Sequence, residues 1–340
     1  MKKLLFSASL GAMLGAGMLV AYGQATEDEV AKAMKEYPHA APAGVDSHAI
    51  DKAPPGAVNQ GPFDAAKWKY GHAWDAPGGA KIWNPVKLKM MQGKKVTGGT
   101  LFAASGPEVY CAMANAGYDF IWVEHQHDAR DWQDTQRMYA ACPDAKAVPG
   151  VRVAYTDERE EQHALDAGAL VLVVPTVRSY EEALKARDWA YFPPLGRRSN
   201  GGGQAFRLYK DVPGGYRATA NDNIVLILMI ETLDGLKDAD RIAKIPGVTA
   251  IFAASGDLGN HSGYKQGDPD YEREINIVHD AAIKAGVRLC GPLAWRDRPD
   301  FTCFQAGSEL GAIARGAKDE LGDLANTQAV PEAGPWAHKK

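Results

Sequence analysis

Polar side chains of the types that bind metal ions, anions and protons stand at four places where an apolar segment ends. The run Glu124-His125-Gln126-His127 follows the first of these segments, and Arg152 lies at the end of the second. Glu231 directly follows the third, and Asp257 comes shortly after the fourth. Taken singly, Arg152 could form a structural ion pair and either carboxylate could cap a turn or a helix. Their recurrence at four segment ends favours one shared site.

Together these groups predict a hard metal site with an acid–base group beside it. Two carboxylates without a cysteine suit Mg²⁺ or Mn²⁺ and leave positions for water and substrate. The Arg152 guanidinium offers a planar fork to a carboxylate or enolate oxygen, and an imidazole can move a proton. The combined chemistry is a cation that polarises a 2-oxo acid, an arginine that stabilises the enolate, and a histidine that completes carbon–carbon bond cleavage or formation.

Two histidines compete for the acid–base role. If the preceding strand continues that far, alternation points His125 away from the place where the other groups meet. We therefore assign the role to His127.

A regular alternation of short apolar segments and amphipathic stretches must position these groups. Such a rhythm predicts parallel strands joined by right-handed helical crossovers, and eight units fit a (β/α)₈ barrel with its chemistry at the carboxyl ends of the strands. A doubly wound open sheet is the alternative, but no GxGxxG follows the first strand. Helices are expected between the strands, and Asp157 is expected to cap one of them. The predicted strands are Gly98–Ala103, Phe120–Val123, Ala147–Val153, Leu170–Val174, Ile224–Ile230, Ala250–Ala254, Val287–Cys290 and Leu310–Ile313.

The composition excludes several classes of protein. The 340 residues include 38 basic and 42 acidic side chains, giving a net charge of −4, and 46% are hydrophobic. This balance is typical of globular proteins rather than disordered chains, collagen-like repeats or polytopic membrane proteins. The chain has no excess of basic residues, so its composition does not indicate a nucleic acid as partner.

The amino-terminal residues 1–25 are typical of a signal peptide. Lys2 and Lys3 precede an apolar run over residues 4–21 and a stretch of small residues. An uncleaved membrane anchor is the alternative, although many Gly and Ala make the run weakly hydrophobic. We expect an exported, periplasmic protein that is free of the membrane after cleavage. Residues 26–82 are expected to form an irregular extension, 83–325 the barrel and 326–340 a tail.

Four cysteines follow the signal: Cys111, Cys142, Cys290 and Cys303. Export would permit disulfides, but four cysteines allow three full pairings and the sequence selects none of them. No CxxC pair or neighbouring histidine indicates a zinc site. We expect small buried apolar side chains, with one bridge at most.

Several segments, in a fixed order from about residue 83 to 322, resemble the HpcH/HpaI family of metal-dependent, class II pyruvate aldolases. No single one is specific, but the ordered set is. The segments are Ala116–His127, Val151–Val153, Leu165–Ala169, Val174–Val177, Tyr191–Ser199, Ile230–Thr232 and Gly256–Leu258.

The resemblance implies a role for each matching residue. It implies metal ligands at Glu231 and Asp257, enolate binding by Arg152, and a base at His127 with Glu124 as its carboxylate partner. It also implies substrate carboxylate binding by the amides at Ser255 and Gly256, a pocket wall at Leu293, and an acid, Asp166, near a neighbouring subunit's site.

The resemblance also implies a fold, an assembly and a reaction. The fold is a (β/α)₈ barrel of the phosphoenolpyruvate/pyruvate type, in a trimer or a hexamer of paired trimers that exchange their last helix. The reaction is the reversible cleavage of a 4-hydroxy-2-oxo acid to pyruvate and an aldehyde through a metal-bound enolate, with Mg²⁺, Mn²⁺ or Co²⁺. The alternatives are oxaloacetate decarboxylation, a coenzyme-A ester lyase and a non-catalytic binder of 2-oxo acids.

The chain departs from the family pattern at three positions. Glu124 stands where Asp is common, Gln126 where an acidic residue usually precedes the histidine, and Met229 where relatives often carry a polar residue. The loop Arg197–Gln204 resembles the family's mobile substrate loop. It could select an acidic or polar aldehyde, or it could simply be a surface connection.

Overall fold

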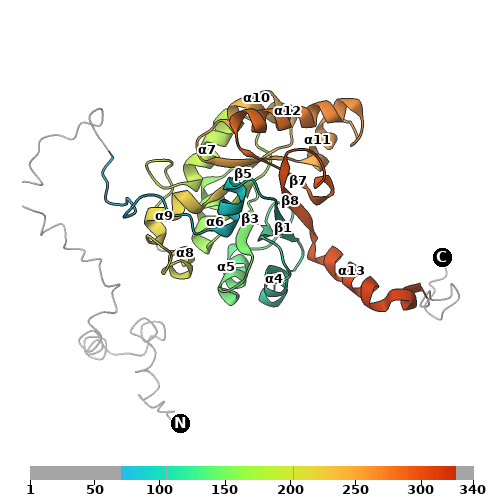
Figure 1. Ribbon diagram of the computed structural model, residues 1–340, viewed down its shortest axis with the longest axis horizontal. Helices are drawn as coiled ribbons and strands as arrows, with labels where there is room; N and C mark the ends of the chain where they lie inside the picture. The colour runs from blue at the N-terminus through green and yellow to red at the C-terminus, as the bar shows by residue number, and fades with distance from the viewer. Residues whose placement is uncertain (1–69, 105, 202, 327–340) are drawn as a thin grey trace, which may run out of the picture. The chain divides into compact units, whose positions relative to one another are not determined.

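The computed structural model describes residues 70–104, 106–201 and 203–326. Within these ranges eight parallel strands close into a barrel in chain order (Figure 1). This confirms the predicted barrel and excludes the open sheet. The predicted signal peptide, residues 26–69 of the extension and the tail from residue 327 lie outside the described residues. The strands are β1 (Val96–Leu101), β2 (Phe120–Glu124), β3 (Val148–Arg152), β4 (Val171–Val174), β5 (Val225–Ile230), β6 (Val248–Ala253), β7 (Arg288–Pro292) and β8 (Phe301–Ser308).

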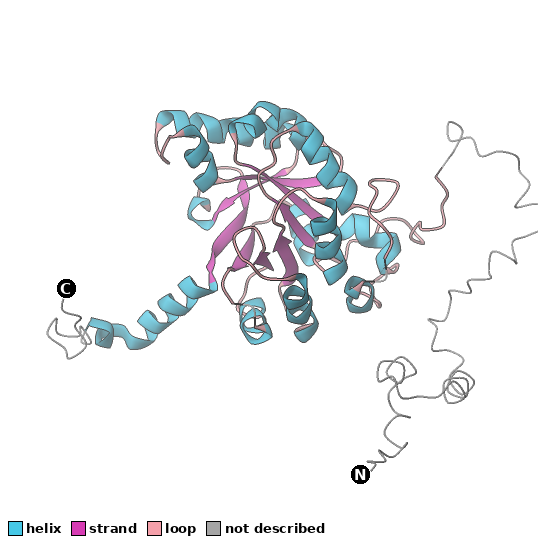
Figure 2. Ribbon diagram, turned by 180° about the vertical axis from the view of Figure 1, so that it is seen from behind, coloured by secondary structure: helices cyan, strands magenta, loops and turns pink. Residues whose placement is uncertain are grey.

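Helices follow the strands and surround the barrel (Figure 2). Polar residues begin several of them. Asp157, as predicted, accepts hydrogen bonds from the amides of Arg159 and Glu160. Ser179 caps α7 (Tyr180–Ala190) and Thr232 caps α10 (Leu233–Ala243) in the same way. The helices are α3 (Pro85–Met91), α4 (Pro107–Ala114), α5 (Trp132–Ala141), α6 (Glu158–Ala167), α7 (Tyr180–Ala190), α8 (Gln204–Leu208), α9 (Tyr216–Asn223), α10 (Leu233–Ala243), α11 (Ser255–Ser262), α12 (Pro269–Ala285) and α13 (Glu309–Leu321), with short 3₁₀ turns η3 (Leu293–Trp295) and η4 (Gly322–Asn326).

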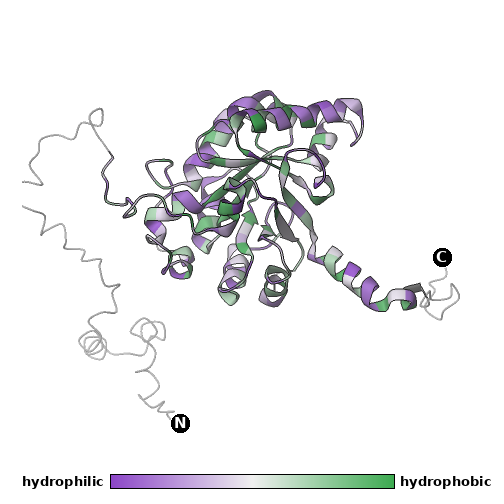
Figure 3. Cartoon of the chain, in the orientation of Figure 1, coloured by the Kyte–Doolittle hydropathy of each residue, from purple (hydrophilic) through white to green (hydrophobic). Residues whose placement is uncertain are grey.

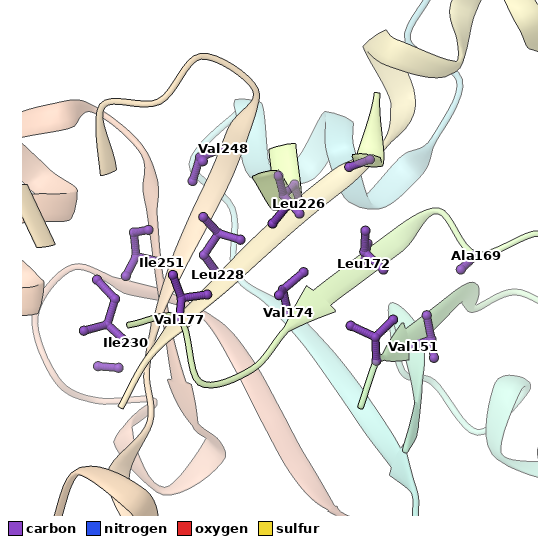
Figure 4. Packing of buried hydrophobic residues seen from close by; sticks show 14 of the residues in the cluster. Val151, Ala169, Leu172, Val174, Val177, Leu226, Leu228, Ile230, Val248 and Ile251 are labelled. Atoms are coloured by element: carbon purple, nitrogen blue, oxygen red, sulfur yellow. The ribbon is translucent and has the colours of Figure 1, made fainter. Parts of the chain in front are cut away.

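The core has two layers because successive strand residues face opposite sides of the sheet. In β2, Phe120 and Trp122 belong to the cluster inside the barrel, whereas Ile121 and Val123 pack outward against the helices. Figure 4 shows the outer layer over β3 to β6. The strands are mainly hydrophobic and the surrounding helices carry many hydrophilic residues (Figure 3). This alternation decides which polar groups point into the barrel mouth, the end at which the carboxyl ends of the strands meet.

The predicted last strand was wrong. The eighth strand is β8 (Phe301–Ser308), and the predicted segment Leu310–Ile313 lies in α13. Ser308 caps that helix through the amide of Gly311. Leu310 and Ile313 are 56% and 62% exposed, so these apolar side chains are not packed in the core of the barrel.

The four cysteines form two disulfides, one more than expected. Cys111 in α4 is bonded to Cys142, which ends α5, and Cys290 in β7 is bonded to Cys303 in β8. The second bridge joins directly paired positions of neighbouring strands. The register of β7 and β8 therefore selects one of the cysteine pairings that the sequence left open.

The last helix leaves the barrel. α13 continues from β8 and extends away from the other helices (Figure 1). Among the described residues, no helix has both the length and the apolar character needed to cross a bilayer.

Candidate active site

Three of the predicted residues enter the barrel mouth by strand alternation. Glu124 continues the inward positions of β2, Arg152 ends β3, and Glu231 continues the inward positions of β5, directly after its last residue. All three are buried. In the β2–β3 register Glu124 stands opposite Arg152, which brings their side chains together.

Glu124 holds Arg152 in place. One carboxylate oxygen, Oε2, accepts from the Arg152 Nε at 2.7 Å and lies 2.6 Å from its Nη2, and Trp122 donates its indole N–H to the same oxygen at 3.3 Å. The Arg152 Nη1 lies 3.9 Å from the Met229 sulfur. Charge-assisted bonds of this kind fix the guanidinium plane. The Nη1 edge, whose neighbour is a weak sulfur acceptor, is left to receive a negatively charged oxygen.

Glu124 contacts His127 through the backbone rather than through the imidazole. Its Oε1 accepts from the amides of Gln126 at 2.6 Å and His127 at 3.2 Å. The exposed imidazole lies face to face with the Phe102 ring, with centroids 6.4 Å apart. The expected Glu124–imidazole pair is therefore absent from the contacts of the described residues. The longer Glu side chain instead bonds both the turn after β2 and Arg152.

His125 faces away from the mouth, as alternation predicts. Its Nε2 lies 2.7 Å from the Thr135 hydroxyl, and its ring stacks on Trp132 with centroids 4.0 Å apart. Burial, together with the nearby positive charge of Arg130, lowers the pKa of His125 to about 4. A neutral imidazole in the helix layer is structural, which leaves His127 as the histidine at the mouth.

Glu231 has one paired and one unpaired oxygen. Its Oε1 accepts from the Thr176 backbone amide at 2.5 Å and from the Thr176 hydroxyl at 2.9 Å. Its Oε2 is buried and has no partner among the described residues. Burial raises the pKa of Glu231, the two bonds from Thr176 oppose this, and the nearby charge of Asp257 raises the pKa further. A cation at this place would relieve both the burial and the repulsion.

The two carboxylates fit a divalent cation. Asp257 lies in the first turn of α11, which follows β6 at the mouth. Within the described part of the chain no group of three or more His, Cys, Asp or Glu side chains could hold a metal ion. The predicted ligands, Glu231 and Asp257, would provide two carboxylates. A hard cation held by two carboxylates keeps positions for water and substrate.

Thr176 is a site residue that the sequence analysis missed. It follows β4 and has a φ of 52°. Its hydroxyl oxygen also accepts a hydrogen bond from the Gln126 side-chain nitrogen Nε2 at 3.1 Å. A positive φ is rare for a β-branched residue and is retained where surrounding contacts enforce it. Its place two residues after a strand end was the available signal.

The remaining predicted substrate contacts also lie at the mouth. Ser255 and Gly256 begin α11, whose start has no side-chain cap, so its first amides are available to an anion. Leu293 follows β7 and is partly buried against the core.

Asp166 lies at the opposite end of the barrel within its own chain. It is in the last turn of α6, just before β4 begins, and its carboxylate binds the Arg198 Nη2 and the Gln162 Nε2 at 2.8 and 2.7 Å. Arg197, in the same loop, pairs with Asp188 near the end of α7. The predicted substrate loop therefore does not reach the mouth of its own barrel.

Comparison with known proteins decides the family. The model of the HpcH/HpaI aldolase/citrate lyase family matches residues 100–315, which include β2 to β8 and the whole mouth. The chain belongs to this family. It is 29% identical over 236 residues to a 2-keto-3-deoxy-L-rhamnonate aldolase of Klebsiella pneumoniae, covering 69% of this chain and 88% of that enzyme. It is 28% identical to a hydroxypyruvate/pyruvate aldolase of Delftia acidovorans, covering 74% and 96%.

Solved structures agree with this assignment. A family member from Burkholderia cenocepacia superposes with a TM-score of 0.64 at 25% identity, covering 71% of this chain and 99% of that one. Because the family is that of the aldolases and citrate lyases and the relatives are aldolases, this protein is an enzyme, a carbon–carbon lyase.

Proposed function

We propose that this aldolase is a divalent-metal-dependent aldehyde-lyase that reversibly cleaves 4-hydroxy-2-oxo acids to pyruvate and an aldehyde. The observation that carries the proposal is the buried, unpaired Glu231 Oε2 near Asp257, at the mouth into which Arg152 also projects. Arg152, together with a cation that the two carboxylates would hold, would place positive charge where an enolate develops negative charge.

The pyruvate half of the substrate is held by fixed groups. Glu231 and Asp257 would hold the divalent cation, which would supply the charge that polarises the 2-oxo group. Arg152, fixed by Glu124, donates to the oxygen that becomes the enolate. The amides at Ser255 and Gly256 bind the carboxylate, and Leu293 contacts the apolar side of the three-carbon unit.

His127 moves the proton. The imidazole, free of hydrogen bonds among the described residues, accepts the proton of the 4-hydroxyl group. The C3–C4 bond then breaks, its electron pair stays with the pyruvate half as the enolate, and C4 leaves as the aldehyde. A proton delivered to C3 completes pyruvate.

The test is pyruvate release from racemic 4-hydroxy-2-oxo acids, with and without Mn²⁺. We expect metal-dependent release that falls at least 100-fold in Glu231→Gln and His127→Ala. Glu181→Gln and His72→Ala, both at exposed positions, are matched controls that should retain the wild-type rate. Release without metal, or full activity in Glu231→Gln, would disprove the proposal.

We also propose that the aldolase is a homo-oligomer, a trimer or hexamer, that exchanges α13. The support is the apolar surface of the projecting helix, where Leu310, Ile313 and Leu321 are exposed. In such an assembly Asp166 would lie near a neighbouring subunit's site. Light scattering should give a multiple of the subunit mass for the wild type and a smaller mass for the Leu310→Glu, Ile313→Glu double variant. A monomeric wild type would contradict this.

Export to the periplasm is proposed on the signal-like residues 1–25 and is supported by the two disulfides, which persist in oxidising compartments. Cell fractionation and amino-terminal sequencing of the mature protein test it. Recovery of uncleaved protein from the cytoplasm alone would contradict it.

A further inference from the structure

A cavity of about 290 Å³ opens beside His127 at the barrel mouth. Its walls come from the connections after β2, β3 and β4, so it adjoins the proposed catalytic groups without containing the predicted metal ligands. This volume is near the lower limit for small-molecule sites. The lining residues are Gln126, His127, Ala154, Tyr155, Thr156, Pro175, Thr176, Arg178 and Glu182.

The proposed mechanism brings part of the substrate next to this cavity. The pyruvate half is held between Arg152, the carboxylates and the start of α11, and His127 acts on the hydroxyl group at C4. The atoms next to C4 therefore lie near His127. The cavity that His127 lines, next to Thr176, is in position to receive them.

Two lining residues have buried polar atoms without partners. The Gln126 Oε1 and the Thr156 Oγ1 are both buried, and neither has a hydrogen-bond partner among the described residues. The other end of the Gln126 amide is fixed, because its Nε2 donates to the Thr176 hydroxyl at 3.1 Å. Buried polar groups normally have partners. A carbonyl oxygen and a hydroxyl together match a ligand that bears its own hydroxyl groups.

The positively charged side chain of Arg178 lies at the edge of the cavity. The Arg178 side chain is 64% exposed, and its only ion pair among the described residues is a long one, 3.9 Å from Nη1 to the Glu182 Oε1. The other carboxylate oxygen of Glu182, Oε2, accepts a hydrogen bond from the Arg178 backbone amide at 2.9 Å, which holds this carboxylate near the start of α7. Most guanidinium donors of Arg178 are therefore available to an anion.

We propose that this cavity binds the aldehyde half of the substrate and selects an aldehyde with a hydroxyl group near its carbonyl and an anionic group at its far end. Gln126 and Thr156 would recognise the hydroxyl group, and Arg178 the anion, whether carboxylate or phosphate. The inference rests on the proposed aldolase function and names its substrate class.

The test is the aldol addition of pyruvate to matched aldehydes in the presence of Mn²⁺. Glyceraldehyde 3-phosphate is compared with glyceraldehyde, and succinic semialdehyde with butanal, which identifies the preferred anion. We expect the wild-type kcat/KM to favour at least one anionic member by about tenfold, equal to about 1.4 kcal/mol. Arg178→Gln should abolish that ratio through KM, and Arg178→Lys should keep part of it. Arg273→Gln, which changes an exposed arginine on α12, is the control.

The hydroxyl contacts have a separate readout. Thr156→Val should lower the glyceraldehyde-to-propanal ratio of kcat/KM about tenfold, because only the first aldehyde carries a hydroxyl group next to its carbonyl. An anionic preference that is absent from the wild type, or that persists in Arg178→Gln, overturns the proposal.

Failure of the cavity proposal can be told apart from failure of the aldolase proposal. Exchange of the pyruvate methyl protons with D₂O, followed by NMR on the wild-type enzyme, needs the enolate chemistry but no aldehyde. Exchange together with the absence of any anionic preference overturns only the cavity assignment. If Mn²⁺-loaded enzyme shows no exchange, both proposals fail.

Discussion

Replacing Glu161 with Met should make the protein more stable at neutral pH. Glu161 lies on the core-facing side of α6, is fully buried, and both of its carboxylate oxygens lack a partner among the described residues. Burial raises the pKa of this carboxyl well above its ordinary value, and the charge of Asp157 adds to the effect. Met has a similar length and no polar oxygen to leave unpaired.

The size of the gain follows from the unpaired oxygens. Leaving a buried polar group unsatisfied costs about 1–3 kcal/mol, so Glu161→Met should raise the free energy of unfolding by about that amount. In a domain of this size each kcal/mol corresponds to about 2–4 °C in the melting temperature. We therefore expect an increase of about 2–12 °C.

The effect should also depend on pH. Since the folded-state pKa of Glu161 is raised, the unfolded chain releases its proton first, and stability falls as the pH rises above the unfolded-state pKa toward the folded-state one. The advantage of Glu161→Met should be larger at pH 8 than at pH 5. Glu161→Gln, which cannot ionise but keeps two unpaired polar atoms, should remove this pH dependence without the full gain.

The assay is thermal unfolding followed by circular dichroism at pH 5 and pH 8, with one scan rate for all three proteins. A Met variant that melts below the wild type at both pH values would refute the reasoning, because it would show that the carboxyl group makes favourable contacts. Equal gains at the two pH values would refute the part that concerns ionisation.

Three further outcomes follow from the site and the disulfides. Glu124→Gln should lower kcat/KM for pyruvate release about 100-fold, because Arg152 loses its buried counter-charge; a change below threefold would contradict this. Thr176→Val should weaken Mn²⁺ binding about 10–100-fold in calorimetric titration, since Glu231 loses one of its two fixed donors; an unchanged Kd would exclude this positioning role. Cys111→Ser should lower the free energy of unfolding by about 2–4 kcal/mol under oxidising conditions, measured by urea denaturation; equal stability would indicate that the bridge is not formed.

The sequence determined the architecture because strand and helix patterns are local. Positions at the ends of apolar segments placed Arg152 and Glu231 at the mouth, and alternation along the strand pointed His125 away from it. The same reasoning failed at residues 310–313. An apolar patch on an exposed helix and a short strand have similar local patterns, and only packing distinguishes them.

Only the tertiary structure decided which polar groups meet. The β2–β3 register sets Glu124 opposite Arg152 and so changes the expected partner of the carboxylate. The β7–β8 register pairs Cys290 with Cys303, and the closeness of β4 and β5 brings Thr176 to Glu231. These contacts join residues that are far apart in the chain. Local periodicity fixes the direction in which a side chain points, whereas the closure and register of the barrel fix what lies opposite it.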